Sequence, residues 1–216
     1  MTDKNLTEVA IILDRSGSMS TIRTDMQGGF KSFVADQRGL PGRCVFSLYQ
    51  FDDSHETVYE ERDINQIESL ELVPRGSTAL LDAMGRSIVR IGERLAKKPE
   101  AQRPGGVIVL VITDGQENAS REFNADQIRA MVKRQETEWN WKFAFLGANI
   151  DAFATGSALW VGANANFTAS PKGVQNMYIG TSNMLRNYRS AVQDEDVFAM
   201  AAVELNVEPD DSAKYP

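Results

Sequence analysis

The chain has 216 residues, of which 42% are hydrophobic and 25% charged, and its 30 acidic and 23 basic residues give a net charge of −7. This length suits one α/β domain with a substantial core. The acidic balance argues against binding along a nucleic-acid backbone, which needs a basic face, whereas an acidic surface can raise the local concentration of cations.

The first half of the chain predicts a strand, a helix and a hairpin of two further strands, over residues 9–13, 20–36, 44–51 and 57–64. The first run is continuously apolar, which is typical of a parallel strand buried on both faces, and it ends abruptly at Asp14. The helix contains the pair Gly28 and Gly29, which we expect to allow close approach to a sheet. The last strand is polar enough to lie at the edge of a sheet.

The second half predicts helices over residues 78–95, 123–132, 151–159 and 171–188, and strands over 107–112, 141–146 and, more weakly, 163–168. Thr78 lies at or beside the start of its helix, and the most apolar strand stops at Thr113 and Asp114. Such an alternation is typical of a three-layer, doubly wound α/β fold with a mostly parallel sheet and one antiparallel edge strand.

We expect residues 1–190 to form this domain and residues 191–216 to be an acidic extension, packed or partly disordered. The N-terminus shows no basic-then-apolar signal, and no apolar run approaches the roughly 18 residues of a membrane span. A cytoplasmic protein without membrane attachment is therefore expected. Cys44, the single cysteine, is predicted to be buried and inert, and His55, the single histidine, to be a solvated turn residue.

Oxygen-bearing side chains follow the ends of two predicted strands and open one helix, namely Asp14, Ser16, Ser18, Thr78 and Asp114. In an open α/β sheet, ligands bind outside the carboxyl ends of the strands, so these side chains are expected to meet. Two carboxylates and three hydroxyls are hard donors, which suit Mg²⁺, with Mn²⁺ or Ca²⁺ as alternatives, better than zinc. We expect one or both aspartates to act through water.

The combination of these segments resembles the metal-ion-dependent adhesion site of von Willebrand factor A-type domains. The family pattern is Asp-x-Ser-x-Ser, then a distant threonine, then a distant aspartate, and it is matched by residues 14–18, Thr78 and Asp114. The resemblance covers roughly residues 7–188, and the compact length is similar to small standalone members in bacteria and their phages. It implies a Rossmann-like fold and protein–protein binding, often as a subunit of a larger assembly.

Each residue also has a simpler interpretation. Ser16, Ser18 and Thr78 could cap the helices that follow them. Asp82 could orient the site from one turn into its helix, or could be a helix-start carboxylate favoured by the dipole. A further possibility is that Asp52 and Asp53, at the end of another predicted strand, reach the rim of the site.

The leading functional hypothesis is a non-enzymatic recognition module in which Glu or Asp of a protein partner completes the shell of the metal. A hydrolase that uses the same metal is the alternative, although no general base, covalent Asp-x-Asp loop or phosphate-binding lysine motif is evident. In a third possibility the metal only stabilises the fold. The sequence identifies neither the partner nor the oligomeric state.

Overall fold

The computed structural model describes residues 1–148, 151–159 and 161–190. The predicted extension, residues 191–216, lies outside the described residues. None of the helices in the described ranges is both long enough and apolar enough to cross a membrane.

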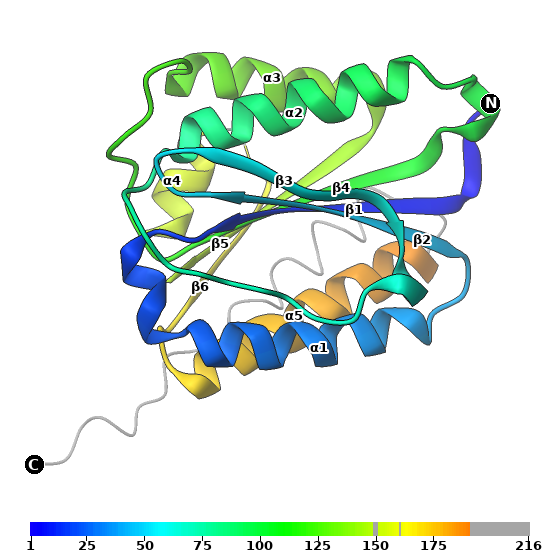
Figure 1. Ribbon diagram of the computed structural model, residues 1–216. Coiled ribbons are helices and arrows are strands. Elements are labelled where there is room, and N and C mark those ends of the chain that lie inside the picture. Colours follow the sequence, from blue (N-terminus) through cyan, green and yellow to red (C-terminus); the bar gives the residue numbers. More distant parts are fainter. Residues whose placement is uncertain (149–150, 160, 191–216) are drawn as a thin grey trace, which may run out of the picture.

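The described part of the chain contains a six-stranded sheet in the order β3-β2-β1-β4-β5-β6 (Figure 1). Its strands are β1 (Asp3–Asp14), β2 (Arg43–Phe51), β3 (His55–Asp63), β4 (Pro104–Thr113), β5 (Trp141–Ala148) and β6 (Ala163–Phe167). Strand β3 pairs with β2 in the antiparallel direction, and the other neighbouring strands run parallel. The predicted sheet with one antiparallel edge strand is therefore confirmed.

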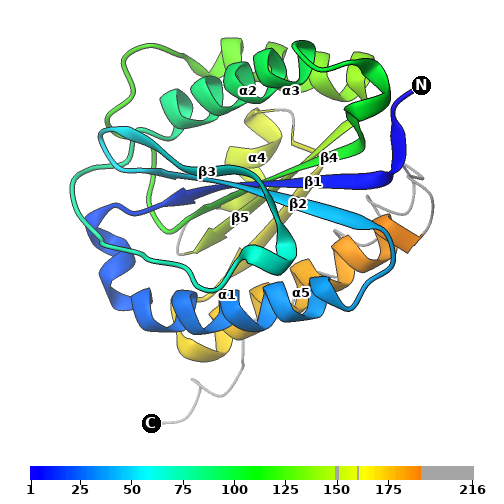
Figure 2. The same cartoon turned by 45° about the vertical axis from the view of Figure 1, so that its right-hand side comes forward.

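Helices cover both faces of the sheet, so the molecule has three layers (Figures 1 and 2). The helices are α1 (Arg23–Arg38), α2 (Leu80–Ala96), α3 (Ala125–Trp139), α4 (Ala152–Ala158) and α5 (Pro171–Ser190). Helices α1 and α5 pack on one face, and α2 and α3 lie on the other. The predicted doubly wound architecture is confirmed.

Strand β1 lies in the middle of the sheet because both of its faces are apolar. Its residues 9–13 are at most 2% exposed. Since successive side chains of a strand point to opposite faces, Val9 and Ile11 enter the core under α1 and α5, whereas Ala10 and Ile12 enter the core under α2 and α3. This central position brings the carboxyl end of β1 beside those of β2 and β4.

The prediction for the glycine pair was wrong, because the close contact is between two helices. A Cβ atom on Gly29 of α1 would come within 2.3 Å of the Tyr178 ring of α5, whereas one on Gly28 would meet nothing. The Tyr178 hydroxyl donates to the carbonyl of Met26 at 3.1 Å, which fixes the ring over the glycine. Gly29 therefore sets the packing of α1 on α5.

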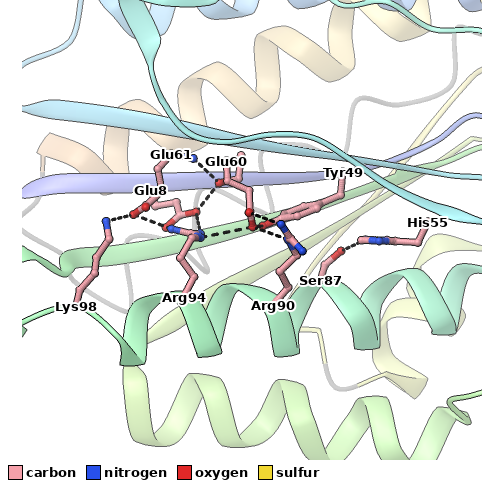
Figure 3. Close-up of polar contacts among 10 residues, drawn as sticks. Glu8, Tyr49, His55, Glu60, Glu61, Ser87, Arg90, Arg94 and Lys98 are labelled. Carbon is pink, nitrogen blue, oxygen red and sulfur yellow. Dashed lines mark hydrogen bonds and ion pairs between the residues drawn. The ribbon is translucent and has the colours of Figure 1, made fainter.

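Helix α2 is attached to the sheet by a network of charged side chains (Figure 3). Glu8, in the interior of β1, accepts from Arg94 Nη2 at 2.5 Å and from Ser47 Oγ at 2.7 Å. Glu60 accepts from Arg90 Nε and Nη2 at 3.0 and 2.8 Å. Burial of Glu8 raises its pKa, and the neighbouring Arg94 charge opposes that rise. The network thus fixes the position of α2 with groups of opposite charge.

His55 belongs to the same region, and its predicted position in solvent was wrong. It begins β3, and its Nε2 lies 2.9 Å from the Ser87 hydroxyl of α2. Its ring also stacks on Tyr49, with 5.6 Å between the ring centroids. The histidine is therefore part of the interface between the edge hairpin and α2.

Candidate metal centre

Three loops meet at the carboxyl edge of the sheet. Asp14 is the last residue of β1, Asp114 directly follows β4, and Thr78 lies two residues before α2. Backbone hydrogen bonds join the loops to one another: Gly17 donates to the Gly76 carbonyl at 3.3 Å, and Asn118 donates to the Thr78 carbonyl at 3.0 Å. The parallel sheet therefore brings together segments that are distant in the sequence.

Side-chain hydrogen bonds connect the loop that follows β1 with the loop that follows β4. The Ser16 and Ser18 hydroxyls are 3.0 Å apart, and Ser18 Oγ donates to Asp114 Oδ1 at 2.6 Å. Thr113 Oγ1, from the end of β4, donates to Asp14 Oδ2 at 2.6 Å. The Asp14 and Asp114 carboxylates are thus held beside each other by hydroxyl groups.

Gly115 shows where the oxygen atoms converge. A Cβ atom built on this glycine would lie 2.9 Å from Thr78 Oγ1, 3.6 Å from Ser18 Oγ and 3.7 Å from Asp14 Oδ2. Three oxygen atoms therefore face the same small space beside Gly115. They come from the end of β1, the loop after β1 and the loop before α2. The structure brings all five predicted residues together, and their role as metal ligands stays a prediction.

The chemistry of the donors fits a hard divalent cation. All five side chains offer oxygen, as Mg²⁺ prefers, and none offers nitrogen or sulfur. Within the described ranges, no three or more His, Cys, Asp or Glu side chains cluster in a way that could hold a metal ion. A cation at the edge of this sheet would accordingly need hydroxyl oxygens in addition to the two carboxylates.

The electrostatics of the two carboxylates also favour a cation. Burial, together with the charge of Asp114, raises the pKa of Asp14 to about 6, and the hydrogen bonds from Thr113 and Ser16 act in the opposite direction. Burial likewise raises the pKa of Asp114, whose bond from Ser18 acts in the opposite direction. A divalent ion between two buried carboxylates would favour their ionised forms and so oppose both shifts.

The capping interpretation of the hydroxyls is not supported. Ser16 precedes the short 3-10 helix η1 (Gly17–Thr21), and its side chain makes no capping hydrogen bond. The N-cap position of α2 is occupied by Ala79, which has no side-chain cap, rather than by Thr78. Ser18 donates to Asp114 and not to a helix end. These hydroxyls consequently face the site instead of terminating helices.

Asp82 stabilises the loop that carries Asp114. Its carboxylate accepts the backbone N–H groups of Arg121, Glu122 and Phe123, each at 2.9 Å. Although burial tends to raise the pKa of Asp82, these three donors hold it below its usual value. Asp82 lies in the first turn of α2, as both interpretations required, and its hydrogen bonds go to the loop that follows Asp114 and not to the five donors.

Asp52 joins the loop after β1 to the loop before α2, and its carboxylate is used by arginines of these two loops and not by the five donors. Its Oδ2 accepts from Arg15 Nε at 2.9 Å and from Arg75 Nε at 2.8 Å, and the carboxylate has no exposed surface. Asp53 is exposed, and its Oδ1 lies 3.3 Å from the point where a Gly76 Cβ would be. The structure thus gives Asp52 a supporting position behind the rim.

Sequence reasoning did not identify several residues that support the site. Asn118 Oδ1 accepts the backbone N–H of Thr78 at 2.9 Å, and Glu117 accepts that of Leu81 at 2.9 Å. These residues lie in a loop without periodicity, so no pattern singled them out. Thr113 could have been found, because a hydroxyl at a strand end beside Asp114 is a natural partner for the carboxylate that ends the neighbouring strand.

The described structure is similar to solved von Willebrand factor A domains. The ArnB paralog VWA2 from Sulfolobus acidocaldarius matches with a TM-score of 0.52 and 19% identity over 81% of this chain and 44% of that one. A von Willebrand factor type A structure from Catenulispora acidiphila matches with a TM-score of 0.55 and 17% identity over 84% of this chain and 43% of that one. The chain thus spans less than half the length of either structure.

A third similar structure is of nearly the same extent as this chain. The vWF domain of the type V pili tip protein Mfa5 from Porphyromonas gingivalis matches with a TM-score of 0.54 and 10% identity over 83% of this chain and 94% of that one. No protein-family model matches the sequence, and no curated protein matches it significantly. These similarities establish a von Willebrand factor A fold for the chain.

Proposed function

We propose that this chain is a metal-ion-dependent protein-binding module of the adhesion type. Asp14, Ser16, Ser18, Thr78 and Asp114 would hold Mg²⁺, and a Glu or Asp side chain of a protein partner would complete its shell. The observation that carries the proposal is the convergence of oxygen atoms from separate loops beside Gly115. Bound there, Mg²⁺ would supply positive charge at the edge of the sheet.

The charge balance of the donors favours an acidic partner. The two carboxylates can neutralise a divalent ion, but three of the five side chains are neutral hydroxyls that add no charge. If either aspartate acts through water, the cation keeps part of its positive charge and attracts a further carboxylate. Mn²⁺ and Ca²⁺ use the same class of oxygen ligands and are the alternative occupants.

Recognition fits the surroundings of the site better than hydrolysis. The single histidine contacts Ser87 and Tyr49 and none of the five donors. Arg15, which directly follows Asp14, is buried against Asp52 and Glu56 and is thereby committed to ion pairs. The site therefore has oxygen donors without a neighbouring imidazole base, and the von Willebrand factor A fold by itself does not decide between the two functions.

Isothermal titration calorimetry with Mg²⁺ and Mn²⁺ tests the metal site. Wild type should bind the ions, Asp14→Ala should lose binding, and Asp126→Ala should retain it, because Asp126 is an exposed carboxylate on α3. Equal affinity in wild type and Asp14→Ala would reject the site. Metal-dependent turnover of a panel of phosphoesters, lost in Asp114→Ala, would instead favour the hydrolase.

Capture of partner proteins in Mg²⁺ or in EDTA tests the second half of the proposal. Proteins from the native host that wild type retains only in Mg²⁺, and that Asp14→Ala does not retain, are the expected partners. Replacing the contacting Glu or Asp of such a partner should abolish its retention. If chelation lowers the melting temperature but leaves partner capture unchanged, the metal is structural only.

A further inference from the structure

Arg75 lies on the loop that precedes Thr78, and it differs from the other arginines near α2 in how much of its guanidinium is already paired. Its backbone N–H donates to the Arg15 carbonyl at 2.7 Å, so it lies beside the residue that follows Asp14. Its side chain is 60% exposed. The guanidinium is therefore exposed on the loop that leads to Thr78, one of the proposed metal ligands.

Asp52 fixes the direction of this side chain. Arg75 Nε donates to Asp52 Oδ2 at 2.8 Å, and the same oxygen accepts from Arg15 Nε. Asp52 itself is held by Ser54, whose backbone N–H and hydroxyl donate to its Oδ1 at 2.7 and 2.6 Å. A buried carboxylate with fixed neighbours thus holds an exposed cation, which reduces the conformational entropy that Arg75 would lose on binding.

The outer part of the Arg75 guanidinium remains available. Arg86 and Arg90 each use both Nε and Nη2 on one glutamate, Glu122 and Glu60 respectively. Arg75, by contrast, donates only through Nε among the side-chain hydrogen bonds found in residues 1–148, 151–159 and 161–190. Its two Nη groups can therefore donate to a ligand at the same edge of the sheet.

We propose that Arg75 is a second anchor for the partner, so that the ligand is an acidic segment with two carboxylates, one for the metal and one for Arg75. This proposal rests on the metal-dependent binding proposed above and specifies its partner. The guanidinium fork matches the geometry of a carboxylate, and a charge at the rim of a site selects among ligands that all carry one metal-binding acid.

Selection from a phage-displayed library of random 12-residue peptides, eluted with EDTA, tests the pairing. The variants are Arg75→Ala, Arg75→Lys and, as the matched control, Arg86→Ala, which removes an exposed arginine whose fork is already occupied by Glu122. Wild type and Arg86→Ala should both enrich peptides with two acidic residues. Arg75→Ala should enrich peptides in which only one acidic residue is retained.

Fluorescence polarisation with one selected peptide then measures the contact. Arg75→Ala should weaken binding about fivefold, the upper range for an exposed ion pair, and Arg75→Lys should weaken it less. Changing the second acidic residue of the peptide to its amide should weaken binding to wild type but not to Arg75→Ala. Equal affinities of wild type and Arg75→Ala would reject the anchor while the metal site stands. Failure of wild type to enrich any EDTA-released peptide would reject both proposals.

Discussion

Thr113 holds the carboxylate of Asp14 from the neighbouring strand, with its Oγ1 donating to Asp14 Oδ2 at 2.6 Å. The same hydroxyl accepts the backbone N–H of Gly115 at 3.1 Å, so one side chain orients both the first aspartate and the loop that carries the second. Thr113 is fully buried, which excludes water as a ready substitute for these bonds.

We therefore expect Thr113→Val to lower Mg²⁺ affinity by about 10- to 100-fold, the usual effect of removing a group that orients a metal ligand. The shape of the side chain is nearly conserved, so packing should change little. Calorimetric titration measures the loss, and Thr113→Ser, which keeps the hydroxyl, should restore most of the affinity. Unchanged affinity in Thr113→Val would show that this bond does not position Asp14 for the metal.

Gly115→Ala should damage the site through a direct clash. The new Cβ would lie 2.9 Å from Thr78 Oγ1, closer than ordinary contacts allow. We expect about a tenfold loss of Mg²⁺ affinity, comparable with disturbing a group that orients a ligand. Titration of the variant by calorimetry measures this.

The control is Gly92→Ala, in the interior of α2, where a Cβ meets nothing. This change should leave Mg²⁺ affinity unaltered and raise the free energy of unfolding by about 0.5–1 kcal/mol, because alanine is the better helix former. If both alanine variants bind the metal as wild type does, the space beside Gly115 is not the site.

His55 should remain neutral well below its ordinary titration range. Burial lowers its pKa from 6.5 to about 4, and the charges of Arg86 and Arg90 act in the same direction. Because the pKa is depressed in the folded state, the contribution of His55 to stability is complete above pH 6.5 and is lost as the pH falls toward 4. The chain has one histidine, so its ring proton resonances are unambiguous by NMR.

Those resonances should stay nearly constant from pH 8 to about 5 in the folded protein and should titrate near 6.5 in urea. Ser87→Ala removes the hydroxyl near Nε2 and tests whether that contact, as well as burial, holds the ring in place. A folded-state midpoint near 6.5 in wild type would mean that His55 is solvated after all.

The ion pair between Glu8 and Arg94 should show strong coupling in a double-mutant cycle. Glu8 is fully buried and Arg94 largely so, and removing either partner leaves a charge with one partner fewer. Glu8→Leu and Arg94→Met should each lower the free energy of unfolding by about 3 kcal/mol, and the double variant should lose clearly less than the sum. Urea denaturation monitored by circular dichroism measures the cycle.

The exposed pair between Arg134 and Glu138, one turn apart on α3, provides the comparison. Its cycle should give a coupling of only about 0.3–0.5 kcal/mol. Additive losses at Glu8 and Arg94 would show that the buried network is held by packing and not by charge.

The layout of the site could be predicted from the sequence because it depends on local signals and one topological rule. Continuous apolar runs located β1 and β4, and the carboxyl ends of parallel strands share one edge of a sheet. This was sufficient to expect Asp14 near Asp114, and the structure brings the predicted residues together. The edge position of β3 was predicted correctly from the polarity of its sequence, because an edge strand has one side open to solvent.

The groups that support the site could not be predicted, because their bonds depend on the path of irregular loops. Asn118 accepts the backbone N–H of Thr78, which lies 40 residues earlier in the chain. The carboxylate of Asp82 accepts backbone N–H groups of the loop after Asp114. The contact of Gly29 with Tyr178 likewise depends on which helix packs against α1. Sequence periodicity indicates which face of a helix is buried, but it does not indicate which other element packs against that face.

The central position of β1 has a consequence for how the protein is made. Strand β1 is synthesised first, yet one of its two neighbours, β4, supplies Thr113, which lies 99 residues beyond Asp14 in the chain. Until β4 has left the ribosome, β1 has an open edge and Asp14 lacks both its hydroxyl donor and Asp114. If the proposed metal site is correct, it can therefore form only after β4 has paired with β1, and a chain that ends before Asp114 should not bind Mg²⁺ there.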